Sequence, residues 1–493
     1  MDVTSPPGAA GAAGTGVTGI RWPDVALAVA LTALLALHHV LLGGDLSNDE
    51  CISILVAHSV ATKGEGRTTV YPEMAVGWLC SQLGVTDRAS VQWVLTGASW
   101  LACLASLLLL RRLAGLFLPI RWARLAPVLF LALERIALQY SGPRLIYAAS
   151  LPFAIWAWTA LISAIERRDR RGLVPFVLAT ALGLFAHRVL VMLVPVGLAT
   201  FLLFEPRSSR RFRPSAGLAA ALLAWLFAVL FLFVLRPHIG SGDHASPGLS
   251  LHRLVAGPAS FAYLFPFAFG FALLGSLEAR RSRVIGALVL LVVVLMLGRA
   301  FMLKQHFPRH YLHLAPAIVV LVLVGLRRLV SAGPRWPIAA ALVLAGTVVE
   351  TTVAAASRKA LTADRFPASF VRRVELGYGW ERKEVTLGLV RSLRARGIEG
   401  AYWLSDFPTT TTFYVGREGM KLRLPDNATA EDARRIVDAA RTEARALGHH
   451  RIVVALFDRG GRRGLGVMAP LLDEIGTRVH EDHEHLTYAW LVE

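Results

Sequence analysis

The chain has 493 residues, of which 55% are hydrophobic and only 17% are charged, whereas about a quarter is usual in soluble globular proteins. Apolar stretches of 16 or more residues recur between Val25 and Ala356. This pattern excludes an ordinary soluble enzyme and predicts a polytopic membrane protein whose spans are helices. The net charge of +18 sits mostly in short loops between apolar stretches, where basic residues set topology, so we expect no nucleic-acid partner.

The amino-terminal segment differs in composition from the apolar stretch that follows it. Residues 1–19 are rich in Gly, Ala, Thr and Pro, which is typical of disorder. The segment lacks the basic start and the cleavage site of a signal peptide, so the first span is expected to be a retained anchor. We therefore predict a disordered cytoplasmic amino terminus over residues 1–22 and a transmembrane domain over residues 23–356.

Hydropathy predicts an all-α membrane bundle of about 11 transmembrane helices. Arginines gather at every second turn between them, as at Arg111-Arg112, 167–171 and 280–283, which is typical of cytoplasmic loops. The first loop, 44–88, and everything after the last span are then outside the cytoplasm. The expected spans are 25–43, 90–110, 124–141, 145–165, 172–187, 189–204, 215–235, 258–277, 284–302, 311–326 and 336–356.

The first outer loop begins with two adjacent carboxylates, Asp49 and Glu50, directly after the first span. Such a pair at a membrane surface is a candidate for acid–base chemistry. The alternative is an ordinary solvated loop or an acidic cap of the helix that follows.

Two helices lying on the membrane are predicted within this loop. The first runs from Glu50 to Val60, and the second covers Met74–Leu83 and is opened by Tyr71-Pro72-Glu73. Cys51 and Cys80 both fall in the loop and are candidates for a disulfide if the loop is outside. The apolar face of the second helix would be formed by Val76, Trp78, Leu79 and Leu83.

The tail from residue 357 to residue 493 has dense, alternating charges and reads as a separate domain. Strands alternate there with amphipathic helices, which predicts a small extracytoplasmic α/β domain. The Gly-rich run 459–464 lacks the spacing of a phosphate loop and is interpreted as a turn. The expected elements are helix Glu381–Arg396 ended by Gly397, strand Gly400–Leu404, helix Ala428–Leu447 opened by Asp426-Asn427, strand Arg451–Phe457, helix Val467–Ile475 and strand Thr487–Val492.

Short cationic turns face the same side as the acidic pair. Ionisable groups at membrane depth are costly and indicate function, although arginines near span ends also reach lipid headgroups. The turns hold Arg144 with Tyr147 one helical turn later, the pair His187-Arg188, and Lys304 with Arg309, His310 and Tyr311.

One acidic pair and several cations at one lipid boundary fit a polyprenyl-phosphate substrate. Arg and Lys hold the phosphate, and stabilise it as it leaves. A carboxylate deprotonates the acceptor hydroxyl that attacks the sugar, so a single inverting displacement needs one base.

A metal is only weakly supported, because none of the His-rich segments has a diagnostic ligand spacing. No cofactor is required by the residues, and a divalent metal is left as an open alternative. The segments are His238, His244 and His252 in one outer loop, and His480, His483 and His485 in the tail.

Three motifs together resemble the membrane glycosyltransferases of the GT-C fold, close to the protein O-mannosyltransferases and the lipid A aminoarabinose transferases. Residues 47–50, Ser-Asn-Asp-Glu, resemble the acidic motif of that group's first outer loop. Residues 142–147 resemble the Arg-containing start of its fourth span, and residues 307–316 resemble its Arg-Tyr-Leu-x-x-x-x-Pro segment. The resemblance covers about residues 20–350 in layout.

The resemblance implies a polyprenyl-phosphate-linked sugar donor, transfer on the outer face and inversion at the anomeric carbon. Asp49 would be the base, with Glu50 second, and Tyr71, Glu73, Tyr147, His310 and Tyr311 would contact substrate. The donor phosphate would be bound by Arg144, His187, Arg188, Lys304 and Arg309.

The chain also departs from the family. The usual Lys-Pro-Pro-like segment of the first loop is replaced by Val70-Tyr71-Pro72-Glu73, which leaves the acceptor class open. The Trp-Trp-Asp signature of the oligosaccharyltransferase branch is absent from the sequence, which argues against transfer of a whole oligosaccharide to asparagine.

The sequence therefore predicts a glycosyltransferase of a bacterial inner membrane, acting on a cell-envelope glycan, lipid or protein among membrane lipids. High Arg and Ala usage is the compositional reason for a bacterial source. The alternatives are a transporter or flippase of lipid-linked saccharides, and a polysaccharide polymerase or ligase. A transporter built from inverted halves would show internal repeats, and none is evident in the sequence.

Overall fold

The computed structural model describes residues 20–41, 48–64, 71–133, 145–204, 215–235, 266–302, 313–331, 341, 345, 382–398, 400–405, 419–422, 428–457, 463–482 and 487–493. The chain forms two compact units. Unit 1 comprises residues 1–42 and 60–376, and unit 2 comprises residues 43–59 and 377–493. Helix α2 (Asn48–Lys63) crosses the boundary between them.

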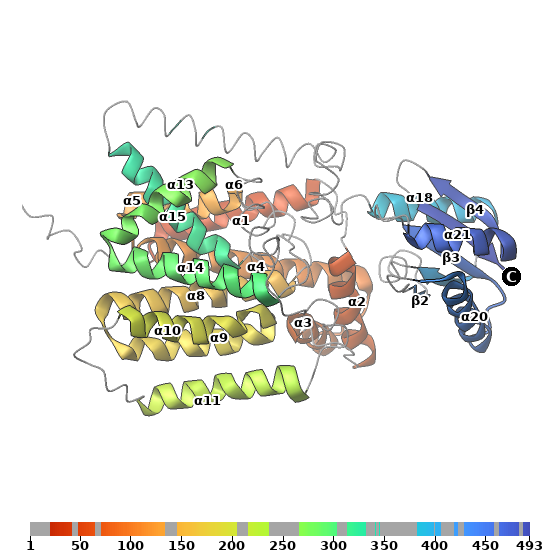
Figure 1. Ribbon diagram of the computed structural model, residues 1–493, viewed down its shortest axis with the longest axis horizontal. Helices are drawn as coiled ribbons and strands as arrows, with labels where there is room; N and C mark the ends of the chain where they lie inside the picture. The colour runs from red at the N-terminus through yellow and green to blue at the C-terminus, as the bar shows by residue number, and fades with distance from the viewer. Residues whose placement is uncertain are drawn as a thin grey trace, which may run out of the picture. The chain divides into compact units, whose positions relative to one another are not determined.

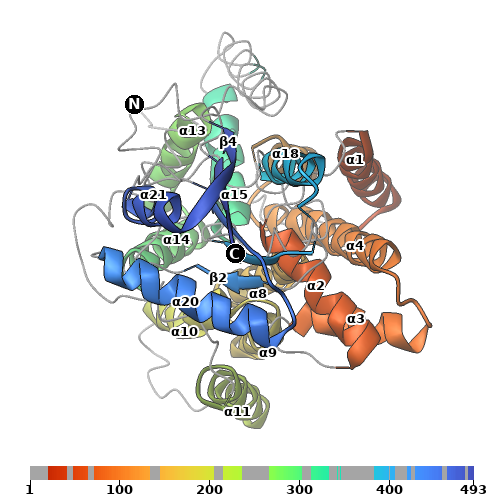
Figure 2. The ribbon, with the colours of Figure 1, turned by 90° about the vertical axis from the view of Figure 1, so that its right-hand side faces the viewer.

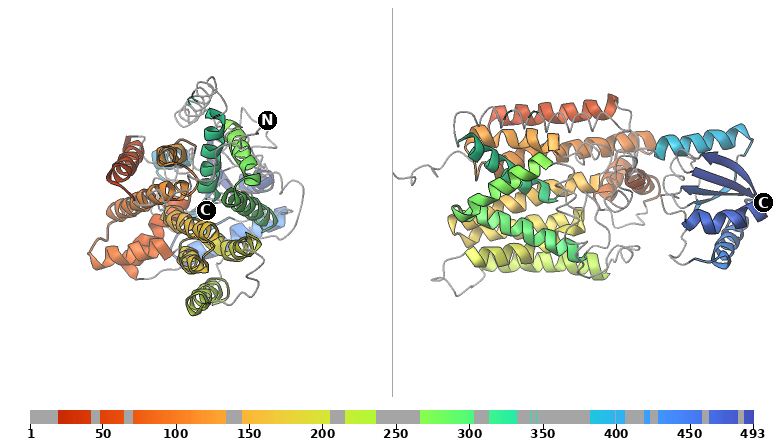
Figure 3. Two further views of the ribbon diagram at one scale, coloured as in Figure 1. Left: turned by 90° about the vertical axis from the view of Figure 1, so that its left-hand side faces the viewer. Right: turned by 45° about the horizontal axis from the view of Figure 1, so that its top comes forward.

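Unit 1 is helical throughout its described part, and its long helices run side by side (Figure 1). α8 packs on α4, α9 and α10 within the bundle of helices (Figure 3). It buries Trp158 in a continuous apolar core. The helices are α1 (Trp22–Leu41), α3 (Tyr71–Gln82), α4 (Arg88–Ala114), α5 (Ile120–Ala123), α6 (Leu125–Leu133), α8 (Leu145–Arg167), η1 (Arg170–Gly172), α9 (Leu173–Ala186), η2 (Arg188–Met192), α10 (Leu193–Phe204), α11 (Ala216–Leu230), η4 (Phe231–Leu235), α13 (Pro266–Ser276), η6 (Leu277–Arg280), α14 (Arg283–Met302) and α15 (Ala315–Val330).

Three described helices are long and apolar enough to cross a membrane, namely Arg88–Ala114, Ala148–Arg167 and Ala216–Val234. The last of these corresponds to α11 with η4, which lies at the margin of unit 1 (Figure 2). Its exposed side chains include Leu223, Phe227 and Val234, as expected of a lipid-facing surface. These helices support a membrane location, while the expected number of 11 spans stays a prediction.

A buried ion cluster joins α1 to the carboxyl end of α4. Asp24 is in the first turn of α1, and its carboxylate is withdrawn from solvent. It lies 3.1 Å from the guanidinium of Arg111 and 2.8 Å from Nε of Arg124, and it accepts the backbone N–H of Arg21 at 3.0 Å. Arg111 is only 3% exposed, so the carboxylate compensates a charge that would otherwise be buried alone.

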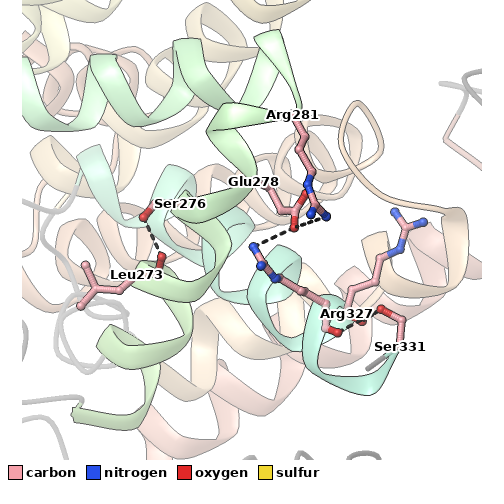
Figure 4. Close-up of polar contacts among 7 residues, drawn as sticks. Leu273, Ser276, Glu278, Arg281, Arg327 and Ser331 are labelled. Carbon is pink, nitrogen blue, oxygen red and sulfur yellow. Dashed lines mark hydrogen bonds and ion pairs between the residues drawn. The ribbon is translucent and has the colours of Figure 1, made fainter. Parts of the chain in front are cut away.

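α13 and α15 cross with their backbones in close approach. A Cβ atom at Gly275 would overlap the carbonyl oxygen of Leu321, and one at Gly325 would overlap the carbonyl oxygen of Phe271. Next to this crossing, Glu278 of η6 forms an ion pair with Arg328 of α15 at 2.9 Å. Glu278 also lies 3.9 Å from Arg281 (Figure 4). Shape and charge therefore fix this end of α15.

Unit 2 is a five-stranded mixed sheet in the order β2-β1-β3-β5-β4. β2, β1 and β3 are parallel to one another. β5 is antiparallel to both of its neighbours, β3 and β4. The pairing of β4 with β5 shifts register between Arg478 and His480. The elements are α18 (Arg382–Ala395), β1 (Tyr402–Ser405), β2 (Gly419–Lys421), α20 (Ala430–Ala446), β3 (Ile452–Phe457), α21 (Arg463–Ile475), β4 (Gly476–Asp482) and β5 (Thr487–Val492).

Helices cover both faces of this sheet, because successive strand residues point to opposite sides. Val437 of α20 and Met468 of α21 pack with Trp490 on one face. Leu389 of α18 packs with Trp403 and other strand residues on the other face. The result is a three-layer α/β unit, and this part of the predicted fold class is seen directly.

Some expectations for the tail need correction. β2 and β4 were not predicted, because β2 has three residues and β4 is a polar edge strand without an apolar run. α20 is capped by Thr429 and not by Asp426-Asn427, because Thr429 and Asp432 form a reciprocal capping box. Gly397 does follow α18 as predicted, with φ of 66°. Most of the Gly-rich run 459–464 lies outside the described residues.

The first loop also differs from expectation in two ways. Cys51 and Cys80 are both present as thiols, so the proposed disulfide is not formed. In α3, the side buried within the fold is formed by Glu73, Val76, Gly77 and Cys80, so Val76 of the predicted apolar face is turned inward. Trp78, Leu79 and Leu83 of that face are exposed, which is the arrangement expected of an apolar face that contacts lipid.

Candidate functional site

The predicted site residues differ in how far the structure describes them. Asp49 and Glu50 lie in the first turn of α2, in the part of that helix that belongs to unit 2, and their side chains are not described. Tyr147 lies in the first turn of α8, also without a described side chain. Outside the described residues are Arg144, Lys304, Arg309, His310 and Tyr311. The site can therefore be built from unit 1 around Tyr71, Glu73, His187 and Arg188.

Tyr71 opens α3 and stands in an aromatic cluster. Its ring meets Phe185 of α9 edge-on at a centroid distance of 5.7 Å and Phe231 of η4 at 6.2 Å. Phe185 and Phe231 are themselves 6.2 Å apart. Aromatic side chains from three elements thus form one wall, and Tyr71 contributes the polar hydroxyl.

Glu73 lies one position beyond Pro72 in the first turn of α3 and is fully buried. α3 packs on α4, α8 and α9, which together withdraw this carboxylate from solvent. Burial of a carboxylate is costly unless polar groups compensate it. The contact of Glu73 with substrate stays a prediction.

His187 marks the point where α9 ends. Its backbone is extended, with φ of −153° and ψ of 121°, and its N–H donates to the carbonyl of Gly183. Its Nδ1 accepts the backbone N–H of Val189 at 3.2 Å, so the imidazole caps the short helix η2. The predicted cationic turn at His187-Arg188 is therefore a capped junction between α9 and α10.

Arg188 follows directly in η2 and contacts aromatic side chains. Its guanidinium carbon lies 5.3 Å from the ring centre of Phe233, a cation–π arrangement. Tyr71 contacts Phe231 of the same short helix, so the two predicted residues both lie against η4. A guanidinium carries N–H donors that bind anions.

Sequence reasoning missed His313 and Ser150. His313 lies just before α15 and is 2% exposed, and its Nε2 shares a hydrogen bond of 2.7 Å with Oγ of Ser150 in α8. Its ring lies 5.1 Å from that of His187, centre to centre. The signal that could have found His313 is an imidazole within the cationic segment 303–316, but the predictions were placed on His310 and Tyr311 instead.

A metal site is not formed by the described part of the chain, where no group of three or more His, Cys, Asp or Glu comes together. His480 lies on β4, whereas His483 and His485 of the same cluster lie outside the described residues. The question of a divalent metal is therefore left to experiment.

The described arrangement brings imidazole, guanidinium and phenol groups to the place where α3, α8, α9, η2 and the start of α15 meet. Imidazole N–H and guanidinium groups donate hydrogen bonds to anions, and the aromatic wall accepts apolar or sugar surfaces. Such a combination can bind a molecule with a phosphate beside an apolar chain.

Comparison with known proteins was made at the levels of sequence and structure. No family model matches the chain, and no curated protein matches it either. Solved structures do match.

ArnT from Cupriavidus metallidurans bound to undecaprenyl phosphate is similar over 96% of this chain and 98% of ArnT, with a TM-score of 0.53 and 15% identity. The apo state of ArnT matches with a TM-score of 0.51. The archaeal oligosaccharyltransferase AglB from Archaeoglobus fulgidus, in complex with an inhibitory peptide and a dolichol-phosphate, is similar over 95% of this chain and 74% of AglB. Its TM-score is 0.52 at 12% identity.

These likenesses establish the fold. The chain shares the GT-C fold of these two proteins, so the predicted resemblance is confirmed at the level of fold. Identities of 12–15% do not extend to the substrate or the acceptor.

Proposed function

We propose that the chain is an inverting glycosyltransferase that moves a sugar from a polyprenyl-phosphate donor to an acceptor on the outer face of a bacterial inner membrane. The observation that carries the proposal is the likeness, over nearly the whole of both chains, to ArnT bound to undecaprenyl phosphate. The domain assignment that goes with it is a membrane domain over residues 23–356 and an extracytoplasmic domain over residues 357–493.

The donor phosphate is proposed to bind to cations at the lipid boundary. Arg188 lies over the ring of Phe233 with His187 beside it in sequence, and we assign both to hydrogen bonds with phosphate oxygens. Arg144, Lys304 and Arg309 are assigned to the same phosphate from their motifs. These donors bind the phosphate more tightly as it leaves with its full charge, and so lower the barrier to transfer.

Asp49 is proposed as the base, and Glu50 as a second acid that positions the acceptor. Both occupy the first turn of α2, where the positive end of the helix dipole favours the ionised carboxylate. An ionised carboxylate is the form needed to accept the proton of the attacking hydroxyl. The new bond forms at the anomeric carbon while the bond to the phosphate oxygen breaks, and the sugar inverts.

The sugar and the acceptor are assigned to Tyr71, Glu73, Tyr147, His310 and Tyr311. The described ring of Tyr71 stands in an aromatic wall that can stack on a sugar face or an isoprenoid unit. The acceptor is a glycan, a lipid or a protein, and unit 2 is a candidate for acceptor binding.

The test is release of sugar from a panel of radiolabelled polyprenyl-phosphate sugars, with the purified full chain in detergent. Wild type is expected to turn over at least one donor, and Asp49→Asn is expected to lose at least about a hundredfold in rate while still binding that donor. Asp87→Asn is the matched control, because Asp87 is an exposed N-cap of α4 that asparagine replaces well.

The outcomes separate the functional classes. Loss of turnover in Asp49→Asn but not in Asp87→Asn supports both the enzymatic activity and the role of Asp49 as the base. Equal activity of Asp49→Asn and wild type overturns the role of Asp49. Absence of turnover and binding with every donor overturns the enzyme, and lipid-flipping assays in vesicles then test transport.

A further inference from the structure

A chain of side chains links three helical elements at the described site. Ser150 of α8 is hydrogen-bonded to His313 before α15, at 2.7 Å, and the ring of His313 faces His187 at the end of α9. Ser150 is fully buried and His313 is 2% exposed. The three residues are far apart in sequence, so only the fold brings them together.

The contacts of His187 define its tautomer. Because Nδ1 accepts the backbone N–H of Val189, that nitrogen carries no proton, and the proton of the neutral ring is on Nε2. The neutral ring of His187 therefore has its one N–H group on Nε2, and the guanidinium of Arg188 is next in sequence. Rotation of the ring would break the cap of η2 and change the direction of this N–H group.

Ser150 differs from most other buried hydroxyls of the described helices. Thr159 in the same helix donates to its own backbone at Ile155, and Ser106 of α4 does so at Ala102. This local bond satisfies a hydroxyl at little cost. Ser150 bonds an imidazole that lies just before α15, and a buried polar pair of this kind specifies one geometry.

We infer that His313, held by Ser150, is a positioning residue that fixes the ring of His187 so that its Nε2–H and Arg188 act together on an anionic phosphate. This inference rests on the proposed function. His313 itself is buried and acts through His187. His313 lies just before α15, so its bond to Ser150 also ties the start of α15 to α8.

Two variants of the full chain separate positioning from packing. His313→Gln keeps an amide that can bond the hydroxyl of Ser150, whereas His313→Leu fills a similar volume without a polar atom. Ser150→Ala removes only the hydroxyl and keeps the test informative if the His313 variants fold poorly. Ser106→Ala is the matched control, because the same atom is lost from a buried serine that bonds its own helix.

The first measurement is histidine nitrogen NMR of the labelled protein in detergent, with the His187 signals assigned from His187→Gln. Wild type, His313→Gln and Ser106→Ala are expected to show His187 protonated on Nε2 alone. His313→Leu and Ser150→Ala are expected to show a mixture of tautomers. An unchanged His187 signal in His313→Leu and Ser150→Ala overturns the inference, with or without a ligand.

The second measurement is the dissociation constant for undecaprenyl phosphate. We expect His313→Leu and Ser150→Ala to raise it by about threefold to tenfold, and His313→Gln and Ser106→Ala to leave it nearly unchanged. Equal affinity in His313→Leu and His313→Gln shows a packing role only and overturns the inference. Failure of wild type to bind overturns the proposed function instead, and the NMR result still decides the position of His187.

Discussion

The two ends of α15 are held by different kinds of contact, although one helix of 16 residues joins them. At the carboxyl end, Gly325 brings the backbone against α13, and Arg328 is paired with Glu278. Before the amino end, His313 is held through a hydrogen bond to Ser150 and a ring contact with His187. The first end depends on close backbone packing and a salt bridge, and the second on hydrogen-bonding side chains.

The difference indicates where the molecule can accept a ligand. Close-packed backbones leave no space for a ligand, and a larger side chain there strains the packing. An imidazole or a guanidinium can exchange one partner for another without repacking its neighbours. The buried cluster of Asp24, Arg111 and Arg124 resembles the first kind, because each described charge there compensates another.

The largest effect is expected at the crossing of α13 and α15. In Gly275→Ala the added Cβ overlaps the carbonyl of Leu321, which belongs to rigid backbone, so the two helices must separate. We expect destabilisation by more than about 4 kcal/mol, or failure to fold. The thermal midpoint and the size-exclusion profile in detergent measure this.

Gly270→Ala in the same helix is the control, because a Cβ there meets nothing within 4 Å. It should melt at or slightly above the wild-type temperature, since alanine favours a helix. If Gly275→Ala melts like Gly270→Ala, the close approach of the two backbones does not hold this end.

The next largest effect is expected for Asp24→Ala. It leaves Arg111 buried without its carboxylate, which should cost about 3–5 kcal/mol of unfolding free energy. The double variant Asp24→Ala with Arg111→Leu removes the stranded charge as well and should recover much of the loss. Chemical denaturation of the purified protein measures both, and a double variant as unstable as Asp24→Ala would contradict the charge argument.

The smallest effect on stability, with a specific effect on binding, is expected for Arg188→Gln. The contact with Phe233 contributes about 1 kcal/mol at most, so the melting temperature should fall little. The dissociation constant for undecaprenyl phosphate should rise about tenfold or more, because a charged donor is lost. Arg281 is an exposed arginine that follows η6, near the carboxyl end of α15, and Arg281→Gln should change neither quantity.

The variants Arg188→Gln and Arg281→Gln test most directly whether the two ends of α15 differ in role. A large loss of stability in Arg188→Gln, close to that of Asp24→Ala, would mean that both ends serve structure. A normal affinity in Arg188→Gln would remove this residue from the donor site.

The helices were predictable where local pattern dominates. α9 and α14 match the expected spans to within about three residues, because long apolar runs end at arginine or histidine turns. β5 was predicted with its observed limits, since an aromatic and β-branched run leaves few alternatives. β2 and β4 are strands because they pair with β1 and β5, and no local sequence pattern indicates that pairing.

Long-range polar contacts were not predictable from the sequence. Asp24 is an unremarkable acid at the start of a span, and its partner Arg124 is 100 positions away. His313 and Ser150 are 163 positions apart, and their relation depends on how α8 and α15 pack. By contrast, His187 and Arg188 were singled out because polar groups at membrane depth are rare, and Tyr71 because of its place in the first loop of the resembling family. The structure places both Tyr71 and Arg188 against rings of η4, at Phe231 and Phe233.

The two margins of the sheet in unit 2 have a consequence for how copies of the chain meet. An open strand edge offers unpaired backbone groups to a neighbouring chain, which is the usual start of aggregation. Among the described residues, one edge is β2, only three residues long, and the other is β4, whose register is broken between Arg478 and His480. The charges of Arg478 and Glu481 follow that second edge. Edge-to-edge association of two such sheets is thus disfavoured, even at the high local concentration that confinement to a surface imposes.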